Sequence, residues 1–253
     1  MIERERHGEG TESAVTVLRL AHGKVSALDR ELVAALAQEL ATAEAAGSAV
    51  VLTGTGSVFS AGVDLFRLVE EAGEYRERFL AELCALFHQL VEFPRPLVAA
   101  LNGHALAGGF VTACGCDYRI GVTGPATIGF TELKVGVPFP RIAQAMVLAV
   151  TPVHLREPML YLAEPMPVAE AHRHGLLHEL VSPGELAARA LEVANRLAAV
   201  PPPAFAATKR QLREHQGLTD VADELDDLVA AWSSAGTLDA IRGFLAELRA
   251  KRR

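Results

Sequence analysis

Two glycine-bearing segments carry the residues best suited to chemistry. One runs from Phe59 to Asp64 (Phe-Ser-Ala-Gly-Val-Asp), and the other runs from Asn102 to Asp117 and contains Ala-Leu-Ala-Gly-Gly. Each follows a short β-branched, apolar run, so glycine stands where a strand is expected to give way to a helix. The first N–H groups of a helix have no intrahelical partner and can converge on developing negative charge. The two segments together therefore predict an oxyanion hole.

The elements expected around these segments alternate between strand and helix. Asp29 is a candidate N-cap for a helix with leucines at helical spacing up to Gly47, and an apolar helical face predicts a second helix over 75–93, which Pro94 and Pro96 end. Strands are expected at residues 14–20, 49–53, 97–101, 118–121 and 126–129.

From about Ile142 the chain is expected to be mainly helical. Pro201-Pro202-Pro203 forms a break before a helix over 204–212, and helical periodicity returns over 221–232 and 238–248. The layout predicts an α/β fold in two parts, a core over residues 1–195 and a C-terminal helical region over residues 196–253.

The composition excludes several classes of function. The chain has 253 residues, half of them apolar, a net charge of −7 and a pI near 5.7, so a large core is expected and nucleic acid is disfavoured as the main partner. The first six residues are charged rather than signal-like, and no apolar run approaches the length of a membrane span. We therefore expect no membrane association and a cytoplasmic location.

Cysteine and histidine are not spaced as ligands or redox partners. Cys84, Cys114 and Cys116 suit neither a disulfide framework nor a zinc site, and we interpret them as buried apolar residues. The histidines do not pair on a helix face with a third ligand in view, so we expect solvated side chains and no metal: His104, His154, His172, His174 and His178. The Gly54-x-Gly56 pair lacks the third glycine of a dinucleotide fingerprint.

The order and spacing of the motifs resemble the crotonase superfamily, the enoyl-CoA hydratases and isomerases. The resemblance implies a spiral core of ββα units, a C-terminal helical region that builds a homotrimer or a dimer of trimers, and an acyl-CoA thioester substrate with no other cofactor. It extends from about Val15 to Phe244 and rests on residues 23–28, 51–54, 59–64, 102–109, 171–177 and 243–245 taken together.

The resemblance also assigns roles to particular positions. The oxyanion donors of the family correspond to the backbone N–H groups of Val63 and Gly108, and a side chain at Gly108 is expected to obstruct the thioester. Arg249 and Lys251 could reach the ligand of a neighbouring subunit, although any single cation could equally be a solvated charge. The coenzyme A moiety is expected to contact Lys24, Val25, Ala61, Gly62, Asp64, Leu65 and Arg67.

The carboxylates sharpen the expected reaction. Hydratases of the family carry two glutamates, and the corresponding positions here are Val111 and Glu132, so one carboxylate is missing. Hydration needs water activation and protonation of carbon, work that two carboxylates share, whereas moving a double bond needs one base. We therefore favour isomerisation of 3-enoyl-CoA to 2-enoyl-CoA, with Glu132 shuttling the proton. Val111 is interpreted as packing, and Asp64 and Asp117 as caps or turn anchors.

Other functions stay open from the sequence. The aspartate of the dienoyl isomerases is replaced by Pro140, which disfavours that branch. Hydratase activity, acyl-CoA hydrolysis or decarboxylation, and a catalytically silent acyl-CoA-binding protein or trimeric scaffold are the alternatives. For hydrolysis or decarboxylation, the candidate side chains are Glu70, Glu71, Glu74 and His88.

Overall fold

The larger of two β-sheets forms the centre of the molecule. The computed structural model describes residues 1–8 and 14–251. The strand order is β1-β2-β3-β5-β7-β10, with β1 antiparallel to β2 and every other pair parallel. Every residue of β3 and β5 is buried, as expected for parallel strands that are covered on both faces. The strands are β1 (Ile2–His7), β2 (Val15–Leu20), β3 (Ala49–Thr53), β5 (Leu97–Leu101), β7 (Tyr118–Val122) and β10 (Glu179–Val181).

The smaller sheet has the order β4-β6-β8-β9. Its strands are β4 (Val58–Ser60), β6 (His104–Leu106), β8 (Thr127–Gly129) and β9 (Met166–Pro167), and β4, β6 and β8 are parallel. Each of these three follows a strand of the larger sheet and precedes a short helix: α2 (Leu65–Glu70), α4 (Gly108–Cys114) and the 3-10 helix η1 (Glu132–Val135). The chain thus repeats a ββα unit three times, which confirms the expected core.

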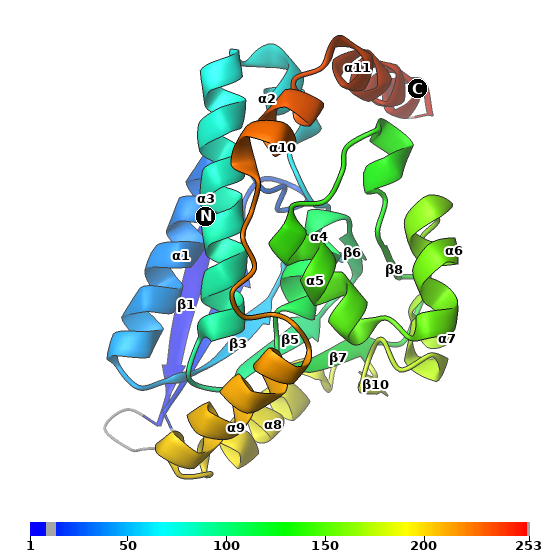
Figure 1. Ribbon diagram of the computed structural model, residues 1–253. Coiled ribbons are helices and arrows are strands. Elements are labelled where there is room, and N and C mark those ends of the chain that lie inside the picture. The colour runs from blue at the N-terminus through cyan, green and yellow to red at the C-terminus, as the bar shows by residue number, and fades with distance from the viewer. Residues whose placement is uncertain (9–13, 252–253) are drawn as a thin grey trace.

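Two long helices cover one face of the larger sheet (Figure 1). Helix α1 (Arg30–Ala45) begins where predicted, because the Asp29 side chain accepts a hydrogen bond from the Leu32 N–H at 2.8 Å. Helix α3 (Gly73–Glu92) buries one apolar face that includes Phe79, Leu83 and Phe87. The opposite face of the sheet packs against α8 (Leu186–Ala198).

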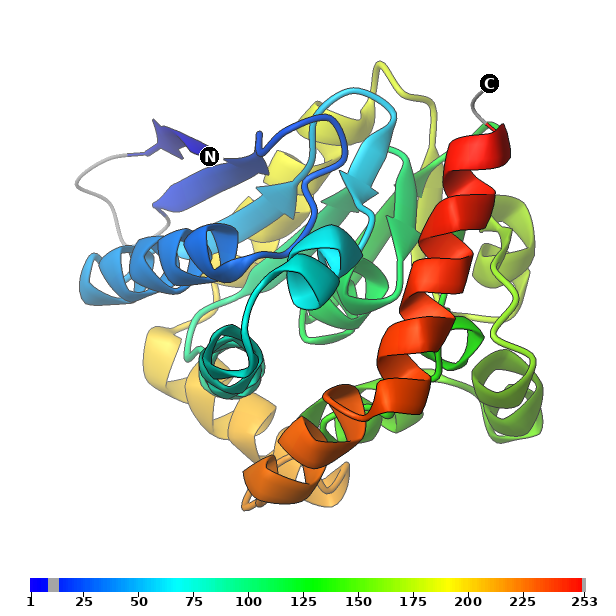
Figure 2. The same cartoon turned by 90° about the horizontal axis from the view of Figure 1, so that it is seen from above.

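The C-terminal helices wrap around this layered core (Figure 2). Helix α11 (Ala235–Lys251) contacts both α2 and η1, so this last helix returns to the loops that follow the smaller sheet. The remaining elements are α5 (Arg141–Val150), η2 (Val153–Leu155), α6 (Arg156–Tyr161), α7 (Val168–Arg173), α9 (Pro202–His215), α10 (Leu225–Trp232) and α11 (Ala235–Lys251).

Among the described residues, five strands lie outside the residue ranges expected from the sequence, and two of them, β4 and β6, are three-residue strands in the glycine-bearing segments. Strand β1 was not expected, because Ile2–His7 is mostly charged and forms an exposed edge without apolar alternation. Strands β9 and β10 lie in the region expected to be mainly helical, and both are too short for a periodic pattern to develop. The helix expected over 221–232 begins only at Leu225.

Two further observations bear on the composition. All three cysteines are buried and unpaired by disulfides, as predicted. No helix within the described residues is long and apolar enough to cross a membrane.

Candidate active site

Three loops at one edge of the smaller sheet hold the candidate site. Strand β4 ends at Ser60, β6 at Leu106 and β8 at Gly129, and Val63, Gly108 and Glu132 follow these ends by two or three residues. Because β4, β6 and β8 are parallel, their carboxyl ends meet at the same edge, where α/β proteins commonly bind ligands. The topology therefore brings together the three residues predicted to be catalytic.

The first two turns approach each other so closely that glycine is required. Gly62 has φ +82°, and a Cβ there would lie 2.7 Å from the Leu106 carbonyl oxygen and 3.0 Å from the Gly108 nitrogen. A Cβ at Gly108 would lie 3.1 Å from Leu28 Cδ1 and 3.5 Å from Val63 Cγ2. Side chains of the protein therefore already limit the space for a side chain at Gly108. The sequence analysis attributed this limit only to the approaching thioester.

Ala107 holds an unusual backbone conformation at the start of α4. Its φ of +47° and ψ of −132° lie outside the regions favoured by residues with a Cβ, and such outliers cluster at functional sites. The Ala107 N–H donates to the Gly129 carbonyl oxygen at 2.8 Å, which fixes the turn against β8. This turn sets the direction of the next N–H, that of Gly108.

The two predicted oxyanion donors are available. Leu28 pairs with the first turn through its N–H to Gly62 O at 2.8 Å and through its carbonyl oxygen, which accepts from Asp64 N at 2.9 Å. These bonds engage the Gly62 carbonyl oxygen and the Asp64 N–H, and they leave the Val63 N–H between them without an acceptor among the described residues. Within the described residues, neither the Val63 N–H nor the Gly108 N–H donates to another group.

Glu132 is the buried acid of the site. Its side chain is 7% exposed, and its Oε2 has no hydrogen-bond partner among the described residues. Burial raises the pKa of this carboxyl to about 8, with smaller opposing effects from hydrogen bonds with the backbone of Glu132 and Thr131. A carboxyl with a pKa near neutrality can both take and give a proton.

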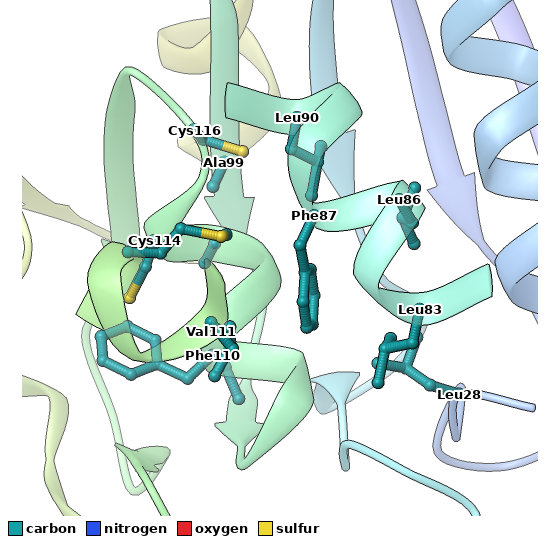
Figure 3. Close-up of a cluster of buried hydrophobic side chains, with 14 of the residues drawn as sticks. Leu28, Leu83, Leu86, Phe87, Leu90, Ala99, Phe110, Val111, Cys114 and Cys116 are labelled. Carbon is teal, nitrogen blue, oxygen red and sulfur yellow. The ribbon is translucent and has the colours of Figure 1, made fainter. Parts of the chain in front are cut away.

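One cavity of about 410 Å³ joins these groups. Val63, Gly108 and Glu132 all line it, and so does Val111, which is 1% exposed. Figure 3 shows Val111 on α4 with Phe87 and Leu83 on the facing helix α3, and both of these also line the cavity. The position where a second carboxylate was expected in a hydratase is therefore part of an apolar wall.

The residues expected to contact coenzyme A divide into two groups. Val25, Ala61, Asp64 and Leu65 line the cavity. Asp64 also caps α2, because its Oδ1 accepts from Phe66 N at 3.0 Å and Arg67 N at 3.2 Å, so the interpretation of Asp64 as a cap is confirmed. Gly62 does not line the cavity and makes the close turn contact described above, and its contact with the coenzyme stays a prediction.

Lys24 and Arg67 do not line the cavity either. Lys24 is exposed at a neighbouring turn. Arg67 forms ion pairs with Glu31 at 2.7 Å and Glu71 at 3.5 Å and lies 4.9 Å from the centre of the Tyr75 ring. With Asp29 at 3.8 Å, this guanidinium faces three carboxylates and joins α2 to α1, which was not foreseen. Its contact with the coenzyme stays a prediction.

The side chains considered for other chemistries lie away from the cavity. Glu70, Glu71 and Glu74 are exposed, and none of them lines it. His88 instead pairs with Asp223, with 3.0 Å between Nε2 and Oδ2. Among the described residues no group of three or more histidine, cysteine, aspartate or glutamate side chains could hold a metal ion.

Asp117 is an anchor, as interpreted from the sequence. Its carboxylate accepts from the Leu97 N–H at 2.8 Å and pairs with Lys209 at 2.9 Å and Arg213 at 3.2 Å. Both cations come from α9, so Asp117 fastens a C-terminal helix to the end of a central strand.

Sequence reasoning missed the contribution of the C-terminal helices to the cavity. Trp232 of α10 and Phe244, Leu245 and Leu248 of α11 all line it. Arg249 lies 5.0 Å from the centre of the Phe66 ring of α2, in the same chain. The apolar face of α11 is visible in the sequence, but the surface that it covers depends on the tertiary fold. The side chain of Lys251 lies outside the described residues.

Comparison with known proteins places this site in a family. The family model described as enoyl-CoA hydratase/isomerase matches residues 10–227. The chain belongs to this family. A Thermus thermophilus protein provisionally named an enoyl-CoA hydratase is 34% identical over 202 residues, which cover 78% of this chain and 79% of that protein. The short-chain-enoyl-CoA hydratase of Clostridium acetobutylicum is 28% identical over 201 residues, which cover 78% of this chain and 77% of that protein.

Solved structures of this family have the same fold. The crystal structure of human mitochondrial delta3-delta2-enoyl-CoA isomerase superposes with a TM-score of 0.91 over 99% of both chains, at 24% identity. That similarity covers the C-terminal helices as well as the core. The crotonase-like fold expected from the sequence is therefore confirmed.

Proposed function

We propose that this protein is an enoyl-CoA isomerase that converts 3-enoyl-CoA to 2-enoyl-CoA with Glu132 as the only acid–base group. The observation that carries this proposal is the single buried carboxylate among the described residues that line the cavity, because the other lining carboxylate, Asp64, caps α2. Glu132 is buried and lines the same cavity as the two residues with available N–H groups, and Val111 lies in its apolar wall.

The proposed reaction has two proton transfers. The Glu132 carboxylate takes a proton from C2 of the 3-enoyl thioester, and the electron pair moves into a dienolate with its charge on the thioester oxygen. The N–H groups of Val63 and Gly108 stabilise that charge. Glu132 then returns the proton to C4, which leaves the double bond between C2 and C3. No water enters the balance, which suits a cavity with mostly apolar walls in which the second acid, Asp64, is engaged as the cap of α2.

Hydration of 2-enoyl-CoA is the second candidate. The names of the two relatives above favour it. Against it stands the apolar wall at Val111, because a water molecule there would find no second carboxylate to orient it. A catalytically silent acyl-CoA-binding protein is the third candidate, and it would leave the orphaned Oε2 of Glu132 without a role.

Parallel assays of the purified protein separate the three candidates. The formation of conjugated thioester from 3-enoyl-CoA reports isomerisation, and its loss from 2-enoyl-CoA reports hydration. The proposal predicts an isomerisation rate at least about a hundredfold above the hydration rate, the lower range for a well-placed acid–base group. Faster hydration would contradict it, and binding of acyl-CoA without either reaction would favour the silent protein.

A further inference from the structure

The cavity walls away from the two N–H groups are almost entirely apolar. No lysine, arginine or histidine of the described residues lines the cavity. Its polar side chains are Asp64, Thr131, Glu132 and Trp232, and Asp64 is engaged as the cap of α2. A second carboxylate carried by the acyl group would be buried near Glu132 without a cation to pair with, which is strongly unfavourable.

Trp232 is the largest of these lining side chains, and it is firmly held. The ring is 3% exposed, and its Nε1 donates to the Pro138 carbonyl oxygen at 2.9 Å. Pro138 follows η1, the element that carries Glu132. The indole therefore bridges α10 and the segment that continues from the catalytic loop.

The backbone beside Trp232 is fixed as well. Ser233, the next residue, accepts a hydrogen bond on its Oγ from Arg76 Nε at 3.1 Å. The same arginine donates through Nη1 to the carbonyl oxygens of Leu68 and Glu71, both at 2.9 Å. Arg76 thus joins α3 to the C-terminal ends of both α2 and α10. A wall held at the ring and at the backbone is expected to limit the ligand rather than adapt to it.

The size of the cavity bounds what fits behind the thioester. A water molecule occupies about 30 Å³ in the liquid, and a methylene group is of similar size, so about 410 Å³ holds roughly a dozen non-hydrogen atoms. The thioester group uses some of this space. The coenzyme is expected to occupy the part lined by Val25, Ala61 and Leu65, so the remainder limits the acyl chain to roughly ten carbons at most.

We propose that this site selects uncharged, apolar acyl chains of medium length, and that Trp232 closes the acyl end of the cavity and sets the upper limit of length. This inference rests on the proposed function for the position of the thioester at Val63 and Gly108. It adds a substrate class and a specificity-determining residue. Since α10 packs against α3 and α11, Trp232 belongs to the wall formed by these helices rather than to the strand-edge loops.

Binding of saturated acyl-CoA thioesters tests the proposal without any turnover. Affinity is measured by calorimetry for straight chains of about four to sixteen carbons, a range set around the expected fit. In the unaltered protein, affinity should rise about fourfold for each methylene up to roughly eight to ten carbons, and then fall at least about tenfold by sixteen. An ω-carboxy acyl chain of equal length should bind at least about a hundredfold more weakly.

Three variants identify the closing residue. Trp232→Ala should move the best chain length upward by at least roughly three carbons, because the indole occupies about the volume of several methylenes. Trp232→Phe keeps a bulky wall and should move the best chain length by no more than about one carbon. Leu228→Ala is the matched control, since Leu228 is a buried residue of α10 that does not line the cavity, and it should keep the original profile.

The outcomes separate this inference from the proposed function. An unchanged length profile in folded Trp232→Ala, or tightest binding of the sixteen-carbon chain by the unaltered protein, would overturn the role of Trp232. Equal binding of the ω-carboxy chain would overturn the substrate class. A length limit that moves with Trp232 in a protein without isomerase activity would support the acyl site while refuting the reaction.

Discussion

Glu132 is basic because the cavity around it provides little stabilisation for a negative charge. Its carboxyl is buried, and its Oε2 has no hydrogen-bond partner among the described residues. None of the described lysine, arginine or histidine side chains lines the cavity. Loss of hydration therefore outweighs the backbone hydrogen bonds and raises the pKa to about 8. At neutral pH a sizeable fraction of the protein would hold this group protonated. The ionised form is the one that removes a proton from substrate.

The pH dependence of isomerisation follows from this pKa. The value of kcat/KM for 3-enoyl-CoA should rise about tenfold per pH unit below the Glu132 pKa and level off above about 8. The value of kcat/KM increases with pH because the ionised carboxylate of Glu132 is the base in the rate-limiting removal of a proton. Initial rates measured from pH 5.5 to 9.5, roughly centred on that pKa, provide the test. A profile already flat below pH 6 would show that a group of ordinary pKa does the work.

At the scale of elements, the two turns after β4 and β6 position the donors. Gly62 permits the close contact between the turns, and the strained conformation of Ala107 sets the direction of the Gly108 N–H. Leu28 holds the first turn through two backbone hydrogen bonds. Both donors therefore depend on backbone geometry, and their side chains are secondary.

Replacing Gly108 by proline tests the second donor. Gly108 is the first residue of α4, where proline fits a helix, so Gly108→Pro removes the N–H with limited damage to the fold. Loss of one oxyanion donor should lower kcat about 100- to 1,000-fold. Gly108→Ala keeps the N–H and measures the steric part of the loss, because its Cβ would lie in the cavity, 3.1 Å from Leu28 Cδ1. Similar kcat values for the two folded variants would speak against this donor.

Some strands, helices and site residues could be predicted from the sequence, and others could not. The central strands, α1 and α3 were predictable because their apolar periodicity and the Asp29 cap are local signals. The positions of Val63, Gly108 and Glu132 came from the resemblance to the family's motifs, and their roles stay predictions. The φ of Ala107 and the place of Trp232 were not predictable, because each depends on contacts with residues far away in the chain. Strand β1 was missed because its pairing leaves a charged edge.

For the whole molecule, the C-terminal helices are tied into the core at two places. Asp117 binds Lys209 and Arg213 of α9, and α10 and α11 line the cavity. The division into a core over 1–195 and a helical region over 196–253 stays a prediction, as do the homotrimer and the dimer of trimers. The mass of the purified protein in solution would determine the oligomeric state.

Removing the Asp117 anchor should destabilise the whole chain. Asp117→Ala leaves the side chains of Lys209 and Arg213, each 7% exposed, without their carboxylate. Breaking a buried pair in this way costs about 3 to 5 kcal/mol of unfolding free energy, which urea denaturation would measure. Asp239→Ala is the control, because it breaks an exposed pair with Arg242 and should cost less than about 1 kcal/mol. Equal losses in the two variants would contradict an anchoring role.

The most direct test of the account is the turnover of Glu132→Gln, which keeps the size of the side chain and removes its basicity. Isomerisation of 3-enoyl-CoA and binding of a saturated acyl-CoA are measured together on the variant and on the unaltered protein. The account predicts a kcat at least about a hundredfold lower with affinity changed by less than about threefold, because the carboxylate acts on the proton and not on binding. Full isomerase activity in Glu132→Gln would contradict it.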